Sequence, residues 1–434
     1  MEEYQVKKAK NIQGTIEVPG DKSVSHRAIM LSCLANKPVV IKNFLFSQDC
    51  LSTADCFRQM GIVISYSQES GTVWVAGQGL RGLKEPDGIL DAGNSGTTMR
   101  LLAGILSGQN FLSIITGDDS LRQRPMARVI EPLTKMGAKI HARSQNRKAP
   151  LVILPVTQLA GRSFTTSIAS AQVKSALLLA GLYAADPVTV IEPHLSRNHM
   201  ELMLESFGVK IIAADTTVTI YPPEQLTAPD EVHVPGDISS AAYWLVAASI
   251  IPNSSVTLTQ VGVNPTRTGI IDVLKLMGAN IEIKNNRFYG KEPVADITVS
   301  SAVLHGAIIE KSMIPRLIDE IPVLAVAALF ASGTTRIEGA GELKVKETDR
   351  LAGIAGELTK LGAKFSVLED GLIIEGPQQL QYSICHSRQD HRLAMAIAIA
   401  GLAGNGAELD EADCVKISYP HFFEHLETIS TFEN

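Results

Sequence analysis

Leu274-Lys-Leu-Met-Gly278-Ala-Asn-Ile281 is one of five closely similar segments in this chain of 434 residues. Each segment joins the leucine-bearing end of a helix to a glycine and a short β-like run. A glycine at this point predicts that the helix ends in the left-handed conformation before a strand begins. The other four segments are Phe57–Ile64, Leu133–Ile140, Leu204–Ile211 and Leu358–Phe365. Their recurrence at intervals of about 70 to 85 residues indicates an internal structural repeat.

A second kind of segment alternates with the first and predicts helices that are buried. These segments are rich in small apolar residues, have a polar start and are apolar nearly all round, which is typical of a buried helix. They begin near His26, Thr98, Val173, Ala241, Ile321 and Arg392. Short runs of Val, Ile and Thr between them predict strands. We therefore expect a repeat of two helices and several strands that occurs six times, with three repeats in each domain.

The length of the chain also favours two domains, because one hydrophobic core rarely grows to 434 residues. The phrase Val18-Pro-Gly-Asp21 recurs as Val234-Pro-Gly-Asp237, and we place the crossings between domains at these stiff turns. The predicted domains are residues 21–235, and residues 1–20 together with 236–434. The predicted class is α/β (α+β), with each domain built around three buried helices.

Composition excludes several kinds of partner. The net charge is -6, no long basic run occurs and aromatic residues make up only 5%, so a nucleic-acid partner is not expected. No apolar run has membrane-spanning length without a charge or turn residue, and the first residues lack the pattern of a signal peptide. The five cysteines form no Cys-x-x-Cys pair. We expect reduced thiols in a cytoplasmic protein, without disulfides or a metal site.

The polar starts of the predicted helices carry the candidate site residues. A helix start offers unpaired backbone N–H groups and partial positive charge, which attract anions. In Gly20-Asp-Lys-Ser-Val-Ser-His-Arg27, Ser23 and Arg27 lie one helical turn apart and could grip a phosphate together with Lys22. The alternative is an ordinary solvated helix cap, which we consider less favoured.

Three further segments of the first predicted domain are weaker candidates. Gly93 and Gly96, before a helix, would let a ligand approach the backbone, although a plain turn explains them equally well. Arg122 and Arg124 would face the same way in an extended chain, but a surface loop is the usual setting for such a pair. Ser170 precedes the helix of Gln172 and is as easily a simple N-cap as a ligand contact.

The second predicted domain adds carboxylates and more cations at helix starts. The segments are Asp319-Glu320, Lys346-Glu-Thr-Asp-Arg350 and Asp390-His-Arg392. Acids at helix starts act as caps for structural reasons alone, so Asp319 and Asp349 each have an ordinary explanation. The combination favours an active site, because the cations could meet two carboxylates and a histidine in a cleft between the domains.

At these residues the chain closely resembles the family of 3-phosphoshikimate 1-carboxyvinyltransferases, also called EPSP synthases, over essentially its whole length. The matching phrases are Gly20–Arg27, Gly93–Arg100, Arg122–Met126, Ser170–Ser175, Lys346–Arg350 and Asp390–Arg392. The resemblance implies two domains of three β-α-β-α-β-β units each. It also implies transfer of the enolpyruvyl group of phosphoenolpyruvate to the 5-hydroxyl of shikimate 3-phosphate, without a metal or organic cofactor, by a monomer.

The resemblance also implies residue roles. Shikimate 3-phosphate would be bound by Lys22, Ser23, Arg27, Ser170, Ala171, Gln172, Arg197, Asp319 and Lys346. Phosphoenolpyruvate would be bound by Lys22, Gly96, Arg124, Gln172, Glu347, Arg350 and Arg392. Asp319 would take the proton of the attacking hydroxyl, Glu347 or Lys22 would protonate the methylene carbon, and His391 would support a proton transfer.

Two departures from the family pattern affect these expectations. Many members have a lysine directly before the phrase Ser418-Tyr-Pro420, but here Lys416 stands one place earlier, so we leave it out of the site. The pattern of Ser170-Ala171 with Arg197 resembles the subgroup that includes glyphosate-tolerant enzymes. However, Gly96 lacks the extra methyl group of tolerant members, so we expect glyphosate to inhibit in competition with phosphoenolpyruvate.

Two alternatives remain at this point. The family of UDP-N-acetylglucosamine enolpyruvyl transferases shares the fold and the donor, but it resembles Gly-Asp-Lys-Asn at the first motif and uses a loop cysteine. Here Ser23 stands in that motif, and residues 111–126 contain no cysteine. A non-catalytic ring or clamp made of the same repeats would not need Lys22, Asp319, Glu347 and Arg392 at helix starts.

Overall fold

The computed structural model describes residues 3–433. Contacts divide the chain into two compact units, each with its own hydrophobic core. Unit 1 comprises the chain up to Pro19, Gly236–Arg287 and the chain from Pro293 onward, and unit 2 comprises Gly20–Pro235 and Phe288–Glu292. The short segment Phe288–Glu292, which the sequence analysis placed with residues 236–434, thus packs with unit 2.

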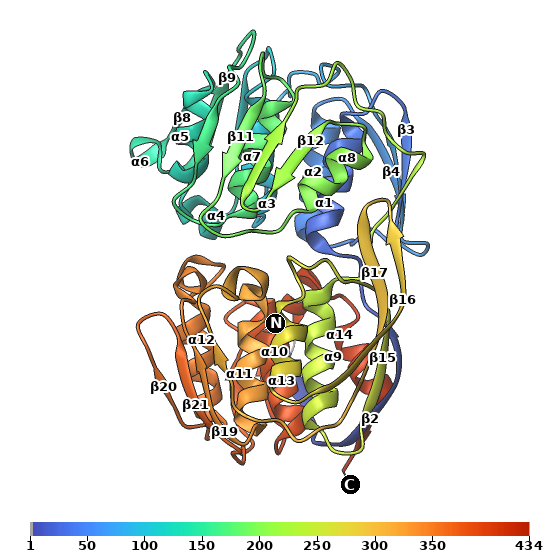
Figure 1. The fold of residues 1–434 in the computed structure, drawn as a ribbon, viewed down its shortest axis with the longest axis vertical. Helices are drawn as coiled ribbons and strands as arrows, with labels where there is room; N and C mark the ends of the chain where they lie inside the picture. The colour runs from blue at the N-terminus through green and yellow to red at the C-terminus, as the bar shows by residue number, and fades with distance from the viewer. Residues whose placement is uncertain (1–2, 434) are drawn as a thin grey trace. The chain divides into compact units, whose positions relative to one another are not determined.

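Unit 2, drawn mainly in blue to green in Figure 1, contains three four-stranded sheets that share the same internal order. In each sheet the first two strands are parallel and the remaining pairs are antiparallel. The first sheet is β14 (Glu231–His233), β3 (Pro38–Lys42), β5 (Thr72–Ala76) and β4 (Val63–Ser67). The second is β6 (Leu90–Asp91), β7 (Ser113–Thr116), β9 (Lys148–Leu154) and β8 (Lys139–Ala142). The third is β10 (Ser163–Thr165), β11 (Val188–Ile191), β13 (Thr217–Ile220) and β12 (Ile211–Ala214).

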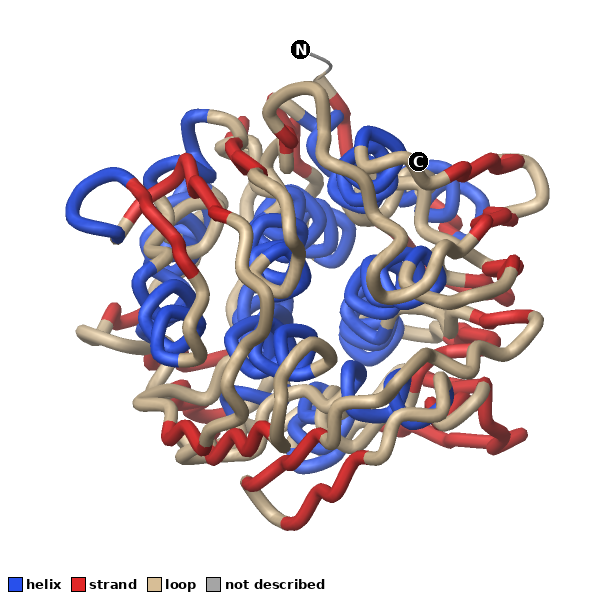
Figure 2. Tube along the Cα trace, turned by 90° about the horizontal axis from the view of Figure 1, so that it is seen from above, coloured by secondary structure: helices blue, strands red, loops and turns tan. Residues whose placement is uncertain are grey.

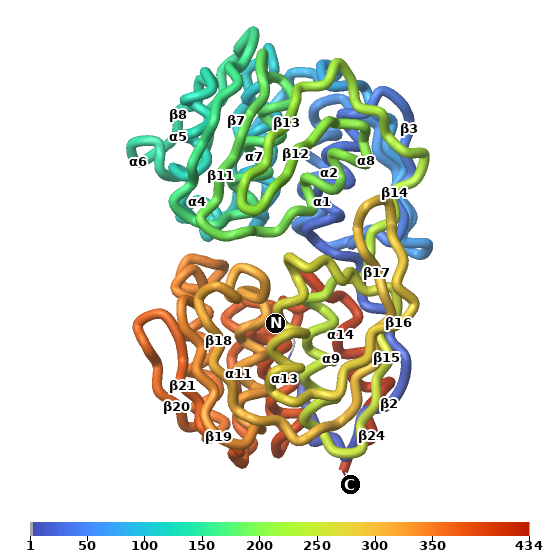
Figure 3. Tube along the Cα trace, viewed as in Figure 1, coloured from blue at the N-terminus to red at the C-terminus, as the bar shows by residue number. Residues whose placement is uncertain are grey.

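Unit 1 also has three sheets, of five, four and three strands, and they include strands from both ends of the chain (Figure 3). Its first sheet is β16 (Asn280–Tyr289), β17 (Glu292–Ser300), β15 (Ser255–Gly262), β2 (Ala9–Glu17) and β24 (Ser430–Phe432). The second is β18 (Ile308–Ile309), β19 (Gly333–Ile337), β21 (Leu372–Gly376) and β20 (Phe365–Val367). The third is β1 (Tyr4–Val6), β23 (Ala407–Asp410) and β22 (Ile384–His386). The parallel pairs are β2–β15, β18–β19 and β22–β23.

The helices fall into a buried set and an outer set, and in Figure 2 the strands lie mainly around them. The buried helices are α1 (Lys22–Cys33), α3 (Gly96–Leu106) and α7 (Ala171–Gly181) in unit 2, and α9 (Ile238–Ile250), α11 (Ile321–Phe330) and α13 (His391–Ala403) in unit 1. The outer helices are α2 (Gln48–Gln59), α5 (Ala127–Lys135), α8 (His199–Ser206), α10 (Gly269–Leu276), α12 (Arg350–Lys360) and α14 (Phe422–Ile429). The six expected buried helices and the β-α-β-α-β-β repeat are confirmed.

The five repeated glycines have the predicted backbone conformation. Gly61, Gly137, Gly208, Gly278 and Gly362 have φ angles of 86°, 101°, 79°, 94° and 85°. Each follows the C-cap residue of an outer helix, where a left-handed residue ends the helix and any side chain would be strained.

The chain enters and leaves unit 2 through paired backbone segments. Within unit 2, the backbone N–H of Asp21 donates to the carbonyl of Pro235 at 2.7 Å. Within unit 1, the N–H of Asp237 donates to the carbonyl of Pro19 at 2.9 Å. The two ends of the continuous segment Gly20–Pro235 are therefore held side by side. Among the described residues, no helix has both the length and the apolar character needed to cross a membrane.

Candidate active site

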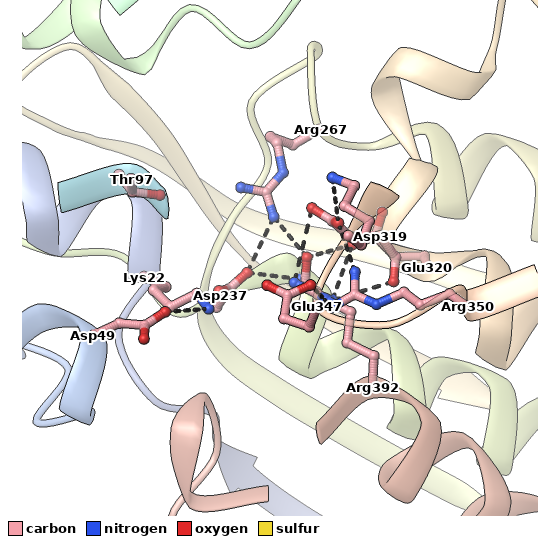
Figure 4. A network of polar contacts seen from close by, with 12 residues as sticks. Lys22, Asp49, Thr97, Asp237, Arg267, Asp319, Glu320, Glu347, Arg350 and Arg392 are labelled. Atoms are coloured by element: carbon pink, nitrogen blue, oxygen red, sulfur yellow. Dashed lines mark hydrogen bonds and ion pairs between the residues drawn. The ribbon is translucent and has the colours of Figure 1, made fainter. Parts of the chain in front are cut away.

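The start of α1 presents charged side chains that are held by buried partners in unit 2. Asp21 caps the helix by accepting from Val24 N, and Lys22 Nζ donates to Asp49 Oδ2 at 3.1 Å (Figure 4). Arg27 donates to the carbonyl of Ser23 at 2.8 Å and to Ser175 Oγ at 2.7 Å. Burial lowers the pKa of Arg27 to about 10, so the guanidinium remains a cation at neutral pH.

A chain of buried hydroxyl groups connects α1 with the start of α3. His26 Nδ1 lies 2.7 Å from Thr53 Oγ1, which lies 2.7 Å from Thr98 Oγ1. Thr98 Oγ1 in turn donates to Ser95 Oγ at 2.8 Å, and Ser95 caps α3. Burial lowers the pKa of His26 well below its usual value, so the ring is neutral at physiological pH. The helix starts that carry Lys22 and Gly96 are thus fixed by one polar network.

Gln172 has an amide whose orientation is fixed by two neighbours from α3. Its Oε1 accepts from Arg100 Nη1 at 2.5 Å, and its Nε2 donates to Thr97 Oγ1 at 3.0 Å. A β-carbon on Gly96 would lie 2.7 Å from Arg100 Nη1 and 3.4 Å from Arg124 Nη1. Because Arg100 is also held by Gln172 and by Pro125 O, a side chain at position 96 would disturb Arg100 and its contact with Gln172.

The expectation that Arg122 and Arg124 face the same way in an extended chain is wrong. Residues Asp119–Gln123 form the short helix α4, which Asp118 caps. Arg122 lies in this helix and forms a surface ion pair with Asp119. Arg124 follows the helix in an extended conformation and donates to both Asn94 Oδ1, at 2.6 Å, and Asn94 O, at 3.2 Å. Arg122 is therefore helical while Arg124 is extended, and only Arg124 contacts a residue next to Gly96, namely Asn94.

Ser170 caps α7, and a buried carboxylate supports it. Glu192 Oε1 accepts from Ser170 N at 3.1 Å, and its Oε2 accepts from Ser196 N at 3.3 Å. Lys174 forms ion pairs of 2.8 Å with both Glu192 and Glu201. Burial opposes the charge on Lys174, but these two carboxylates raise its pKa overall. Glu192 thereby joins the backbone at Ser170 to the loop that carries Arg197.

Unit 1 gathers three cations around the carboxylate of Asp319, two of which, Arg350 and Arg392, are labelled in Figure 4. Arg350 Nη1 lies 3.2 Å and Lys346 Nζ 3.4 Å from Asp319 Oδ1, and Arg392 Nη2 lies 3.9 Å from Oδ2. Arg350 also contacts Glu347 at 2.6 Å and Asp390 at 2.8 Å. Burial opposes the charge on Arg350, but Asp390, Glu347 and Asp319 raise its pKa despite the neighbouring Arg392.

The elements of unit 1 explain why these groups meet. Asp319 lies on the 3-10 turn Ile318–Glu320 that leads into α11, and Arg392 lies in the first turn of α13. Asp349 and Asp390 cap α12 and α13, so the ordinary explanation for Asp349 is confirmed. Lys346 and Glu347 precede α12 rather than opening it. The cluster can bind anions and contains carboxylates that can accept or donate a proton.

Four polar residues that support the predicted ones were not predicted from the sequence. Asp49 pairs with Lys22, Arg100 holds Gln172, Glu192 holds the Ser170 backbone, and Glu320 lies beside Arg392. Arg100 and Glu320 stand in segments that were noted, but neither has a spacing that singles it out. Lys416, which was left out, pairs with Asp413 and has a side chain that is 61% exposed.

Comparisons with known proteins first define the class. The solved structure of the enolpyruvyl transferase NikO from Streptomyces tendae matches with a TM-score of 0.81, covering 99% of this chain and 98% of that chain. At 18% identity this likeness shows the fold alone, which is the predicted enolpyruvyl transferase fold. The chain therefore has the fold of an enolpyruvyl transferase.

The chain belongs to the EPSP synthase (3-phosphoshikimate 1-carboxyvinyltransferase) family, whose model matches residues 6–426. The 3-phosphoshikimate 1-carboxyvinyltransferase of Synechocystis sp. is 54% identical, covering 96% of this chain and 93% of that protein. The corresponding protein of Herpetosiphon aurantiacus is 50% identical and 98% of both chains is covered. A solved EPSP synthase from Acinetobacter baumannii is 40% identical, with a TM-score of 0.89 and coverage of 99% and 98%. These relatives favour neither the UDP-N-acetylglucosamine transferase nor the non-catalytic clamp.

Proposed function

We propose that this enzyme transfers the enolpyruvyl group of phosphoenolpyruvate to the 5-hydroxyl of shikimate 3-phosphate and releases phosphate. The observation that carries the proposal is Asp319, a nearly buried carboxylate in contact with Lys346, Arg350 and Arg392. A base surrounded by cations suits a reaction in which a hydroxyl loses a proton beside anionic groups. Family membership supports the choice of both substrates.

Shikimate 3-phosphate is bound mainly by the starts of α1 and α7 in this proposal. Ser23, Arg27, Ser170 and Arg197 provide hydroxyl and guanidinium groups, which suit a phosphate. Ala171 and Gln172, in the first turn of α7, lie against the ring. Lys22, Lys346 and Asp319 complete the set, with Asp319 directed at the 5-hydroxyl.

Phosphoenolpyruvate carries a phosphate and a carboxylate, which call for several cations. Arg350 and Arg392 come from unit 1, and Lys22 and Arg124 come from unit 2. Gln172 contributes its oriented amide, the backbone at Gly96 permits a close approach, and Glu347 is placed by Arg350. Each substrate thus draws groups from both units.

The reaction proceeds by addition and then elimination. Asp319 takes the proton of the 5-hydroxyl as its oxygen bonds to C2 of phosphoenolpyruvate, and Glu347 or Lys22 gives a proton to the methylene carbon. The adduct then loses a proton from its new methyl group and expels phosphate, which restores the double bond. His391, buried at the start of α13, supports one of these transfers.

Released phosphate provides the test of this function. The enzyme is incubated with both substrates and, as a control, with shikimate 3-phosphate omitted. Phosphate release should need both compounds and should disappear in Asp319→Ala. Absence of release with both substrates present would refute the proposal, and UDP-N-acetylglucosamine would be the next acceptor to try.

Inhibition by glyphosate, in competition with phosphoenolpyruvate, also belongs to this proposal. It is supported by Gly96, which has no β-carbon; such an atom would lie only 2.7 Å from Arg100 Nη1. We further propose that the protein is a cytoplasmic monomer. It needs no metal ion or organic cofactor, because side-chain acids and cations suffice for each step. Sedimentation analysis tests the monomeric state, and assays in the presence of EDTA test the independence from metal ions.

A further inference from the structure

Glu320 is a buried carboxylate to which the proposed reaction gives no role. It follows Asp319, is 1% exposed and stands directly before α11. Ser239 Oγ, from the first turn of α9, donates to Glu320 Oε1. Arg267 Nη2 donates to the same hydroxyl at 2.7 Å and to Asp237 Oδ1 at 3.2 Å. Arg267 is itself 2% exposed, so the whole chain of contacts is buried.

The direction of these hydrogen bonds follows from the chemistry of the groups. A guanidinium has only donors, so Ser239 must accept from Arg267, and its own proton can go to Glu320. An ionised carboxylate only accepts, which completes the sequence from Arg267 through Ser239 to Glu320. A buried carboxylate that accepts such a bond is held in one orientation.

Glu320 also faces Arg392, one of the cations proposed to bind phosphoenolpyruvate (Figure 4). Arg392 Nη1 donates to the backbone carbonyl of Asp319 at 3.2 Å and lies 3.9 Å from Glu320 Oε1. Its other carboxylate contact, to Asp319 Oδ2, is also 3.9 Å. The guanidinium therefore lies between two consecutive carboxylates, with both contacts long.

Arg350 provides a contrast within the same cluster. It makes contacts of 2.6 to 3.2 Å to Glu347, Asp390 and Asp319. Such short contacts fix the orientation of the Arg350 guanidinium directly. The long carboxylate contacts of Arg392 suit a guanidinium whose orientation is set by its neighbours and whose N–H groups donate to a ligand.

We propose that Glu320, held by Ser239 and Arg267, is a positioning residue that orients Arg392 for phosphoenolpyruvate. Without the charge of Glu320, Arg392 would turn toward Asp319, which would bind the guanidinium more closely. The donor would then lose part of its binding site. This inference rests on the proposed function, because it needs Arg392 to contact phosphoenolpyruvate.

The test is steady-state kinetics of Glu320→Gln, with each substrate varied in turn. The amide keeps the shape and still accepts from Ser239, but it removes the charge. The KM for phosphoenolpyruvate should rise about tenfold, as for other residues that orient a binding group. The KM for shikimate 3-phosphate should change less than about twofold and kcat less than about threefold. The reason is that the lost contact binds phosphoenolpyruvate equally in the ground state and in the transition state.

Two further variants make the result specific. Ser239→Ala should reproduce part of the rise, and adding it to Glu320→Gln should have little further effect, since both act through one chain. Asp272→Asn is the matched control, because it also removes a carboxylate from an arginine pair in unit 1, with Arg316 at 2.6 Å on the surface. Its kinetic constants should equal those of the wild type.

If the wild-type enzyme is active and folded Glu320→Gln has the same KM for phosphoenolpyruvate as the wild type, the inference is overturned. Equal changes in both KM values and in kcat would also overturn it, because they indicate general loss of structure. If Glu320→Gln fails to fold, Ser239→Ala decides by the same criterion. A wild-type protein that releases no phosphate would instead refute the proposed function.

Discussion

Gly96 shows how one missing side chain shapes the candidate site. A β-carbon there would lie 2.7 Å from Arg100 Nη1, and Arg100 cannot simply move away because it holds Gln172. We predict that Gly96→Ala weakens glyphosate inhibition by about tenfold or more and raises the KM for phosphoenolpyruvate, since a displaced charged donor costs about 1.5 kcal/mol or more. Inhibition constants of wild type and variant provide the measurement.

Gly88→Ala is the control for this prediction. A β-carbon at Gly88 would meet nothing within 4 Å. This variant should keep the inhibition constant of the wild type. Equal glyphosate inhibition of wild type and Gly96→Ala would show that the space beside Gly96 does not set the affinity.

Glu192 is a residue whose effect should be confined to one substrate. It accepts from the backbone N–H of Ser170, which is proposed to bind shikimate 3-phosphate, and of Ser196, which precedes Arg197. We predict that Glu192→Gln raises the KM for shikimate 3-phosphate about tenfold. It should also lower the free energy of unfolding by about 3 kcal/mol, because the buried Lys174 loses a partner.

Kinetics and urea unfolding of the same preparation check both effects. Glu205→Gln, which removes a carboxylate from a more exposed pair with Lys291, should change neither. An unaltered KM for shikimate 3-phosphate in Glu192→Gln would rule out its support of the Ser170 segment.

At the scale of elements, Glu357 joins α12 to β22 by a charge that depends on pH. Burial would raise the pKa of Glu357, but hydrogen bonds from Lys360, His386 N and Arg388 lower it overall. A carboxyl group with a lowered folded-state pKa stabilises the fold above its unfolded pKa of about 4.3, and this contribution is lost as pH falls through the folded value.

We therefore predict that Glu357→Gln lowers the free energy of unfolding by about 2 kcal/mol at pH 7. The difference from the wild type should shrink progressively below about pH 4, as urea unfolding at several pH values would show. Glu375→Gln, at an exposed position on β21, should show no such dependence. A difference that stays constant down to pH 2 would contradict this account of Glu357.

The elements also show what sequence patterns can predict. Gly278 and its four counterparts each end a helix in a left-handed conformation that glycine adopts easily. Because this requirement is local, the repeat can be predicted directly from the sequence. The apolar helices likewise reveal themselves by composition. In contrast, β14 completes the first sheet of unit 2 from far along the chain, and β1 completes the third sheet of unit 1. Such distant pairings depend on tertiary packing and leave no local pattern.

The candidate site divides in the same way. Lys22, Arg124 and Asp319 stand beside turns and helix starts, where the two cations favour anion binding and the carboxylate can act as a base. The orientation of Arg122 was mistaken because Asp118 caps a short helix that no apolar periodicity reveals. Glu192 contacts the backbone of Ser170, and Glu320 is connected to Arg267 through Ser239. The partners are distant in sequence, so these contacts could not be predicted before the fold was known.

At the scale of the whole molecule, the proposal that each substrate contacts residues of both units predicts that one substrate alone protects segments of both units from hydrogen exchange. Shikimate 3-phosphate should slow amide hydrogen exchange at the starts of α1 and α7 in unit 2 and also at the segment before α12 in unit 1. Binding stabilises the contacted segments against local opening. Hydrogen-exchange mass spectrometry with and without this compound provides the measurement. Protection confined to one unit would contradict the proposed sharing of Lys346 and Asp319.

The paired backbone crossings have a consequence for how such a chain can be built. Asp21 is hydrogen-bonded to Pro235, and Pro19 to Asp237, so the segment between them begins and ends at one place. Residues 20–235 therefore have the adjacent ends of an inserted domain, which needs no added linker to join the chain on either side. An ancestor with one three-repeat body could acquire a second copy by insertion at this turn, leaving the strands on either side in register.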